Sequence, residues 1–185
     1  MRAVEVIAVL MFVFLLGISI EKVEITTFLP LAALLGWLLA DLFSGLVHWA
    51  FDTYGSVRTP IVGPAIIRPF REHHADPEAM TRHDFVEVNG ASCLGCLPLL
   101  LLSVVLPLNN YLHAVLVLTC IGILFTNQCH KWAHAEKRSF LIEKLQTLGI
   151  VLRPAEHAKH HTAPYNSHFC TASGWLNRPL NRLLK

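Results

Sequence analysis

Histidine is the residue whose number and spacing most clearly indicate chemistry in this chain. Ten of the 11 histidines lie in polar segments or where apolar runs end, and they are His48, His73, His74, His83, His130, His134, His157, His160, His161 and His168. Several of them recur three or four residues apart, a spacing that places side chains on one helix face and can aim them at one point. Imidazole nitrogen binds Fe, Zn, Cu and Ni. Because one zinc site uses four ligands, the count predicts two metals.

One carboxylate follows the same spacing. Asp52 lies four residues after His48, and Asp41, His48 and Asp52 form a single stripe along a helix at i, i+7 and i+11. An ionisable side chain inside an apolar span indicates function. For Asp41, a polar contact buried against another helix is the alternative.

Three further acids lie beside ligand candidates in the sequence: Glu72, Asp84 and Glu156. Metal-bound imidazoles usually donate their second N–H to a carboxylate or a carbonyl. We therefore expect these acids, together with Asp41 and His168, to support the ligands or to contact substrate. Ordinary solvated loop charge is the alternative for each acid.

The composition is that of a membrane protein. Of 185 residues, 54% are hydrophobic and 15% are charged, and the mean hydropathy is +0.49. This length allows one domain over residues 1–185, and a net charge of +2 gives no reason to expect a nucleic-acid partner. Five cysteines, an odd number, argue against a disulfide framework. Cys93 and Cys96 have CxxC spacing, but they open an apolar run and are interpreted as packing residues.

The hydrophobic runs predict an all-α integral membrane protein. We expect four transmembrane helices at about residues 4–20, 27–51, 91–108 and 111–129. The first run is interpreted as a retained span, because no small-residue cleavage site follows it. The segments 52–90 and 130–185 are polar and histidine-rich, and they form the predicted cap on one side. A helix in the headgroup region is expected at 175–185.

The basic residues predict which side that cap faces. With four spans, Lys22 lies on one side and the other 14 of the 15 Lys and Arg lie on the opposite side. Since positive charge concentrates in cytoplasmic loops, the histidine-rich side is predicted to be cytosolic.

Ligand candidates from the second span, the fourth span and two polar segments are expected to converge at this cytosolic rim. Bundles build two-metal sites from facing helices in this way. Such a site suits iron and O₂ chemistry on lipid chains. A structural zinc cluster and a bis-histidine haem are the alternatives, although a haem uses two axial ligands. A membrane metal carrier is another, but only Asp41 and Ser44 lie deep in a span.

Four segments resemble a known family. They are DLFSGLVHWAFDTYGSV (41–57), RPFREHHADPEAMTRHDFVEVNG (68–90), FTNQCHKWAH (125–134) and EHAKHHTAPYNSHFCTASGWLN (156–177). The chain resembles the plasmanylethanolamine desaturases, also called Kua or carotenogenesis-protein-F-like lipid desaturases, from about residue 36 to 181. The resemblance implies two irons, O₂ as co-substrate, a phospholipid substrate in the membrane and a cytochrome b5-type or other electron donor. It also implies the endoplasmic reticulum membrane in a eukaryote and the inner membrane in a bacterium.

The reaction implied is desaturation of the 1-O-alkyl chain of an ether phospholipid to the vinyl ether of a plasmalogen. The resemblance assigns no catalytic residue beyond the metal ligands, which it implies are His48, Asp52, His73, His74, His83, His130, His134, His157, His160 and His161. The motif at 164–166 is similar to the plant branch, which desaturates an acyl chain of phosphatidylglycerol, whereas the segment around His83 is similar to the plasmalogen branch. An acyl-lipid desaturase and a lipid hydroxylase therefore stay open as alternatives.

Overall fold

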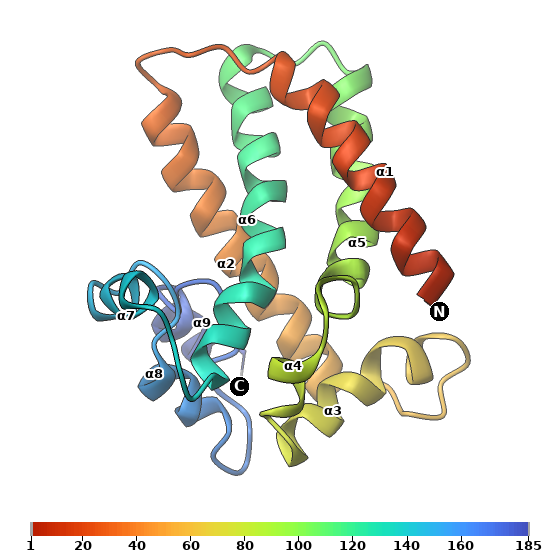
Figure 1. The fold of residues 1–185 in the computed structure, drawn as a ribbon, viewed down its shortest axis with the longest axis vertical. Helices are drawn as coiled ribbons and strands as arrows, with labels where there is room; N and C mark the ends of the chain where they lie inside the picture. The colour runs from red at the N-terminus through yellow and green to blue at the C-terminus, as the bar shows by residue number, and fades with distance from the viewer. Residues whose placement is uncertain (1, 185) are drawn as a thin grey trace. The chain divides into compact units, whose positions relative to one another are not determined.

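The computed structural model describes residues 2–184, and this part of the chain is helical without strands (Figure 1). Its long helices are α1 (Arg2–Glu21), α2 (Leu29–Thr53), α5 (Phe85–Val105) and α6 (Asn110–His134). Each of the four is long and apolar enough to cross a membrane. The short helices are η1 (Gly63–Ile67), α3 (Arg68–Ala75), α4 (Ala79–Arg82), α7 (Phe140–Thr147), α8 (Pro154–His160) and α9 (Asn177–Leu183). The predicted all-α fold with four candidate spans is confirmed.

The third span begins and ends earlier than the hydrophobic run predicts. Asp84 caps α5, because its carboxylate accepts the backbone N–H groups of Val86 and Glu87 while the Glu87 side chain accepts the N–H of Asp84. This capping box starts the helix at Phe85. The helix stops at Val105 because Leu106 precedes Pro107, and a residue before proline disfavours helical geometry.

The described chain forms two compact units. Unit 1 takes in residues 1–40 and 84–127, unit 2 takes in residues 41–83 and 128–185, and α2 and α6 contribute residues to both. In unit 1, α1 packs along α5 (Figure 1). The core there is formed by Ala8, Phe12, Ala40, Cys93, Cys96, Leu100, Cys120 and Ile123. All five cysteines of the chain are unpaired and buried.

Small residues bring α2 and α6 together within unit 1. A Cβ atom at Gly122 would lie 2.7 Å from the Cβ of Ala40, and one at Gly36 would lie 2.9 Å from the Cβ of Leu118. Such contacts are typical of membrane helices, whose backbones approach closely where small residues meet.

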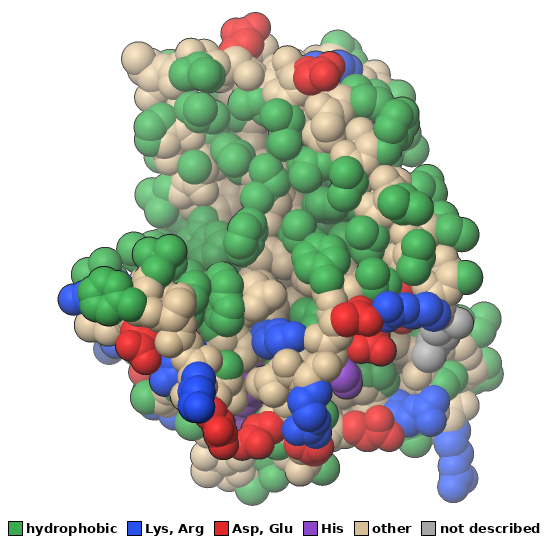
Figure 2. All heavy atoms as spheres, viewed as in Figure 1, with side chains coloured by type: hydrophobic (Ala, Val, Ile, Leu, Met, Phe, Trp, Pro, Cys, Tyr) green, Lys and Arg blue, Asp and Glu red, His purple; other side chains and the backbone are tan. Residues whose placement is uncertain are grey.

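The outside of unit 1 is apolar. Large hydrophobic side chains are exposed on α1, among them Leu10 and Phe14, and on α5, among them Leu101. In Figure 2 hydrophobic side chains are spread over the part of the surface where these helices lie. Exposed apolar area of this kind would be unfavourable in water and suits contact with lipid chains.

In unit 2, the buried carboxylate of Asp41 fastens the C-terminal segment. One of its oxygens accepts the N–H groups of Ala172, Ser173 and Gly174 at 2.8–3.1 Å, and the other accepts that of Leu176 at 3.2 Å. The helix that follows, α9, is shorter than the predicted 175–185. Its Leu180 is buried and lies against Gly45, where a Cβ would come within 2.9 Å of it.

Candidate metal centre

Unit 2 gathers nine of the ten predicted ligands into two clusters. In each cluster, one possible ligand atom per residue lies within 4.8 Å of the corresponding atoms of the others. Cluster A consists of His73, His130, His134, His157 and His161. Cluster B consists of His48, Asp52, His74 and His160.

Helix periodicity explains how the residues divide between the clusters. Every pair four residues apart stays together: His48 with Asp52, His130 with His134, and His157 with His161. Each pair of adjacent histidines is divided, because consecutive side chains on a helix point about 100° apart. Thus His73 and His161 belong to cluster A, whereas their neighbours His74 and His160 belong to cluster B.

The two clusters are neighbours. The ring centroids of His160 and His161 are 5.4 Å apart, and those of His74 and His161 are 5.3 Å apart. His48 of cluster B lies 5.8 Å from His130 of cluster A by the same measure. The arrangement is one continuous centre in which two ions would be close together.

Backbone carbonyls orient two ligands of cluster B. His48 Nδ1 lies 3.1 Å from the carbonyl oxygen of Phe169, and His160 Nδ1 lies 2.8 Å from that of Ser167. A carbonyl only accepts, so each Nδ1 carries the proton and each Nε2 keeps its lone pair. Both Nε2 atoms are buried without a hydrogen-bond partner among the described residues.

Asp52 is the focus of cluster B. Its Oδ2 lies 3.4 Å from Nε2 of His48 and 3.4 Å from Nε2 of His160, and its Oδ1 lies 3.2 Å from Nε2 of His74. The side chain is 8% exposed and has no Lys or Arg partner within 4.0 Å among the described residues, so a bound metal cation would compensate its charge. Three imidazoles around one carboxylate form a mixed nitrogen and oxygen donor set.

Three histidines outside the spans, His73, His157 and His161, are held neutral. Burial, together with the neighbouring histidines, lowers the pKa of His73 to about 2 and that of His161 to about 3. Burial likewise brings the pKa of His157 well below its ordinary value. Neutral imidazole is the form that binds a metal ion.

The spacing of these donors fits metal coordination. In cluster A the Nε2 atoms of His73 and His130 are 2.9 Å apart, and those of His157 and His161 are 3.1 Å apart. Two nitrogens about 2.1 Å from one ion at a right angle would lie roughly 3 Å apart. Further ring nitrogens, including His134 Nε2, are buried without a partner among the described residues. These residues therefore fit a pair of metal ions.

Aromatic side chains enclose cluster B. The ring of Phe70 lies 5.2 Å from that of His48, and the ring of Phe169 lies 5.2 Å from that of His160, between centroids. Tyr165 packs edge-on against His74 at 4.7 Å. Because these rings displace water, electrostatic interactions inside the cluster are strengthened.

Cluster A meets a cavity. His134, His157 and His161 line a space of about 380 Å³, whose polar wall also includes Asp76 and Glu78. Small molecules can therefore approach cluster A from this side.

The remaining predicted residues lie elsewhere. His83 is exposed and belongs to neither cluster; its carbonyl accepts a hydrogen bond from Lys131 at 2.6 Å. Asp41 fastens the C-terminal segment, Asp84 caps α5 and binds the exposed Arg2, and Glu72 is exposed. Glu156 and His168 line a second cavity described below.

Sequence reasoning did not identify the roles of Ser167 and Phe169. Their carbonyls orient His160 and His48, and every residue carries such a group, so its use leaves no sequence signal. The Phe169 ring could have been recognised in the sequence, because this aromatic residue directly follows the candidate site residue His168.

Comparison with known proteins identifies the family. The lipid desaturase domain matches residues 37–184. The chain is 43% identical over 188 residues to the plasmanylethanolamine desaturase of Myxococcus xanthus, covering 97% of this chain and 67% of that protein. It is 46% identical over 168 residues to plasmanylethanolamine desaturase 1 of Mus musculus, covering 85% of this chain and 62% of that protein.

A plant relative is also similar. The chain is 39% identical over 158 residues to the chloroplastic fatty acid desaturase 4 of Arabidopsis thaliana, covering 82% of this chain and 47% of that protein. The chain thus spans about half to two thirds of the length of these relatives. No solved structure matches the chain at a significant level. The family match extends over most of the sequence, and we conclude that the chain belongs to the lipid desaturase family.

Proposed function

We propose that this chain is a membrane di-iron oxidoreductase that desaturates the 1-O-alkyl chain of an ether phospholipid to a vinyl ether. The observation that carries the proposal is the pair of adjacent clusters, built from eight buried or half-buried histidines and one aspartate. Two relatives whose names state plasmanylethanolamine desaturation support the choice of substrate.

Two irons held by clusters A and B would supply the O₂ activation that no side chain can perform. The chain's own residues prepare the centre for this chemistry. The carbonyls of Phe169 and Ser167 fix the rings of His48 and His160, so that their Nε2 lone pairs face the cluster. Burial keeps His73, His157 and His161 of cluster A neutral, and the aromatic wall of cluster B excludes water from its donors.

The proposed reaction balances with the lipid, O₂, two electrons from the donor and two protons. The lipid loses one hydrogen atom from each of the first two alkyl carbons, and a C=C bond forms between them. Two electrons from a donor protein and two protons from water join these hydrogens on the oxygen atoms of O₂, giving two water molecules. The ether oxygen stabilises the electron-deficient first carbon, which makes this the first position to lose hydrogen.

We also propose a cytochrome b5-type donor and a cytosolic position for the histidine-rich side. The supporting observation is the distribution of Lys and Arg, of which only Lys22 lies on the opposite side of the four spans. The membrane would then be the endoplasmic reticulum in a eukaryote or the inner membrane in a bacterium.

Product analysis tests the proposed reaction. Cells that lack plasmalogens would express this chain or a His130→Ala, His160→Ala variant, which removes one ligand candidate from each cluster. They would be fed an alkylglycerol, and acid-labile vinyl ethers would be measured by lipid mass spectrometry. We expect vinyl ether from the parent chain alone.

Other products would redirect the assignment. A new double bond in an acyl chain of phosphatidylglycerol, without vinyl ether, would indicate the acyl-lipid reaction. A hydroxylated alkyl chain would indicate a hydroxylase. Metal flux into liposomes without O₂ consumption would reject the enzyme assignment in favour of a carrier.

A further inference from the structure

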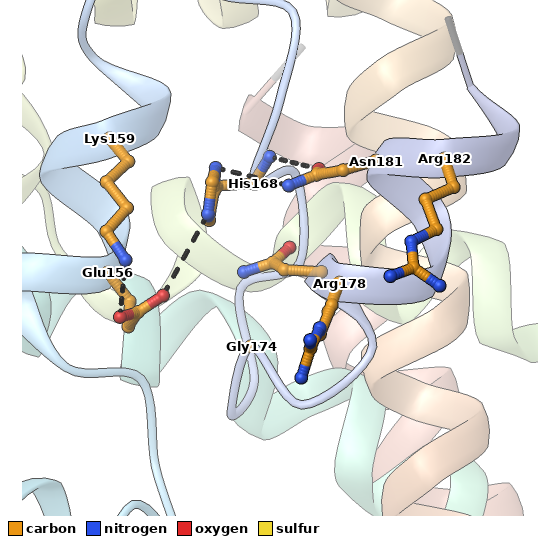
Figure 3. A pocket seen from close by; sticks show the side chains of 8 residues that line it. Glu156, Lys159, His168, Gly174, Arg178, Asn181 and Arg182 are labelled. Carbon is orange, nitrogen blue, oxygen red and sulfur yellow. Dashed lines mark hydrogen bonds and ion pairs between the residues drawn. The ribbon is translucent and has the colours of Figure 1, made fainter.

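A cavity of about 440 Å³ lies beside α8 and α9 in unit 2, separate from the residues of clusters A and B (Figure 3). Its lining is polar and consists of Glu156, Lys159, His168, Gly174, Asn177, Arg178, Asn181 and Arg182. Figure 3 shows Lys159 and Glu156 on one wall and Arg178 and Arg182 on the wall formed by α9.

The cavity carries an excess of positive charge. Lys159 donates to Glu156 at 2.7 Å, and this pair is locally neutral. Neither Arg178 nor Arg182 has an acidic partner within 4.0 Å among the described residues. Two guanidinium groups that line one concave site favour an anion with several oxygens, because arginine can bind phosphate through two parallel hydrogen bonds.

One wall of the cavity also offers an unused donor. The side-chain oxygen of Asn177 accepts the N–H of Cys170 at 2.9 Å, which fixes its amide nitrogen as the free end. That nitrogen is buried and has no hydrogen-bond partner among the described residues, and Asn177 as a whole is 3% exposed. A buried donor without an acceptor is unfavourable, and an anionic oxygen at this wall would satisfy it.

The walls of the cavity are held in place. The side-chain oxygen of Asn181 accepts the backbone N–H of His168 at 2.8 Å, which ties α9 to the loop carrying Phe169. Gly174 has a φ angle of +78°, and a Cβ there would lie 3.0 Å from the Asn177 amide nitrogen. A side chain at this position would therefore press on the free donor.

Helix α8 links the cavity to the metal centre. Glu156 and Lys159 line the cavity, while the residues that follow them, His157 and His160, belong to clusters A and B. A group bound in the cavity would thus lie against the same helix that carries these ligands.

We propose that this cavity binds the phosphate of a membrane phospholipid headgroup, with Arg178, Arg182 and the Asn177 amide as its donors. The inference rests on the proposed function for its role, since the bound lipid would be the substrate. In a glycerophospholipid the first carbon of the chain at position 1 is about six bonds, or roughly 8 Å, from phosphorus. A headgroup site must therefore lie beside the metal centre. This cavity meets that requirement because α8 both lines it and carries candidate metal ligands.

Direct binding tests the proposal independently of turnover. Purified protein in detergent micelles would be titrated with dihexanoyl phosphatidylethanolamine, with dihexanoyl phosphatidylglycerol and with inorganic phosphate, and binding would be measured by native mass spectrometry. The test variant is Arg178→Gln, Arg182→Gln. The control is Arg58→Gln, Arg68→Gln, which loses the same charge at two exposed residues of unit 2 outside the cavity.

We expect the test variant to bind short-chain phospholipid at least tenfold more weakly than the parent, while the control stays within twofold. Asn177→Asp should weaken binding similarly, because it keeps the acceptor for Cys170 and replaces the free donor with a negative oxygen. Unchanged iron content and melting temperature would show that each variant is folded. Asn177→Asp alone decides the question if the double variant does not fold.

Two results would overturn the proposal: equal phospholipid binding by the parent and both cavity variants, or binding of inorganic phosphate alone. Failure of the desaturase assignment would look different. In that case the parent would yield no vinyl ether, yet its phospholipid binding would still be lost in the cavity variants.

Discussion

At the residue scale, adjacent histidines belong to different clusters. His73 and His74 look equivalent in the sequence, as do His160 and His161, yet each pair supplies one residue to each cluster. This division follows from helix geometry, because a rotation of about 100° per residue separates neighbours and reunites residues four apart. A doubled histidine is thus the shortest motif with which one helix can serve two adjacent ions.

Iron content tests this division. His130→Ala, His157→Ala removes two ligands from cluster A alone, and His48→Ala, His160→Ala removes two from cluster B alone. Because the remaining cluster keeps its donors, we expect each variant to fall from two irons per chain to about one. Elemental analysis of purified protein, with melting temperature as a folding check, measures the outcome.

His83→Ala is the matched control for these variants. His83 is a histidine of unit 2 that is exposed and belongs to neither cluster, so we expect this variant to keep both irons. Loss of an iron on this substitution would place His83 among the ligands, as its motif predicts. Loss of both irons from either double variant would show that the clusters do not bind independently.

The types of the site residues were predictable from the sequence, and their partners were not. Spacing indicated the imidazoles and Asp52 because helical intervals are visible in a sequence. The contacts of His48 with Phe169 and of Asp41 with residues 172–176 join positions more than 120 residues apart. Such pairings depend on tertiary packing, which local periodicity does not record.

At the element scale, the crossing of α2 and α6 within unit 1 depends on two small residues. Gly122 faces Ala40 so closely that a Cβ would lie 2.7 Å from the alanine methyl carbon. This packing stabilises the pair through van der Waals contact, since lipid provides no hydrophobic driving force between helices. Both helices continue into unit 2, where they carry ligands.

Gly122→Leu should therefore destabilise the protein. We expect a fall of several degrees in melting temperature in detergent, because the added side chain overlaps Ala40 and forces the helices apart. Gly95→Leu in α5 is the control, since nothing lies within 4 Å of a Cβ there. The packing argument fails if both variants melt at the same temperature.

The helix bounds show where hydropathy alone is insufficient. Hydropathy located all four spans, but it predicted that α5 begins at residue 91. Asp84 and Glu87, seven and four residues earlier, form the capping box that starts the helix at Phe85. The box was visible in the sequence as Asp-x-x-Glu. The π-helical turn at Gly63–Ile67 had no such signal, because the polar segment around it shows no periodicity.

At the scale of the whole molecule, the chain separates two environments. Unit 1 exposes many large apolar side chains, as the upper part of Figure 2 illustrates, whereas unit 2 holds every residue of both clusters and of the cavity lined by Arg178 and Arg182. This combination suits the lipid desaturase family, because an apolar surface can contact the bilayer that contains the lipid substrate while unit 2 holds the candidate metal ligands.

Cysteine labelling tests the proposed orientation. All five native cysteines are buried, so a cysteine introduced at an exposed position reports on its own surroundings. Thr27 lies between α1 and α2, and Glu136 follows α6, so the three spans between them, α2, α5 and α6, put them on opposite sides. In the inner membrane of a bacterial host, an impermeant maleimide added from the periplasm should label Thr27→Cys and leave Glu136→Cys unmodified. Both should react once the membrane is permeabilised. The opposite pattern would place the histidine-rich side outside the cytosol and exclude a cytosolic electron donor, because the donor and the metal centre must share one side of the membrane.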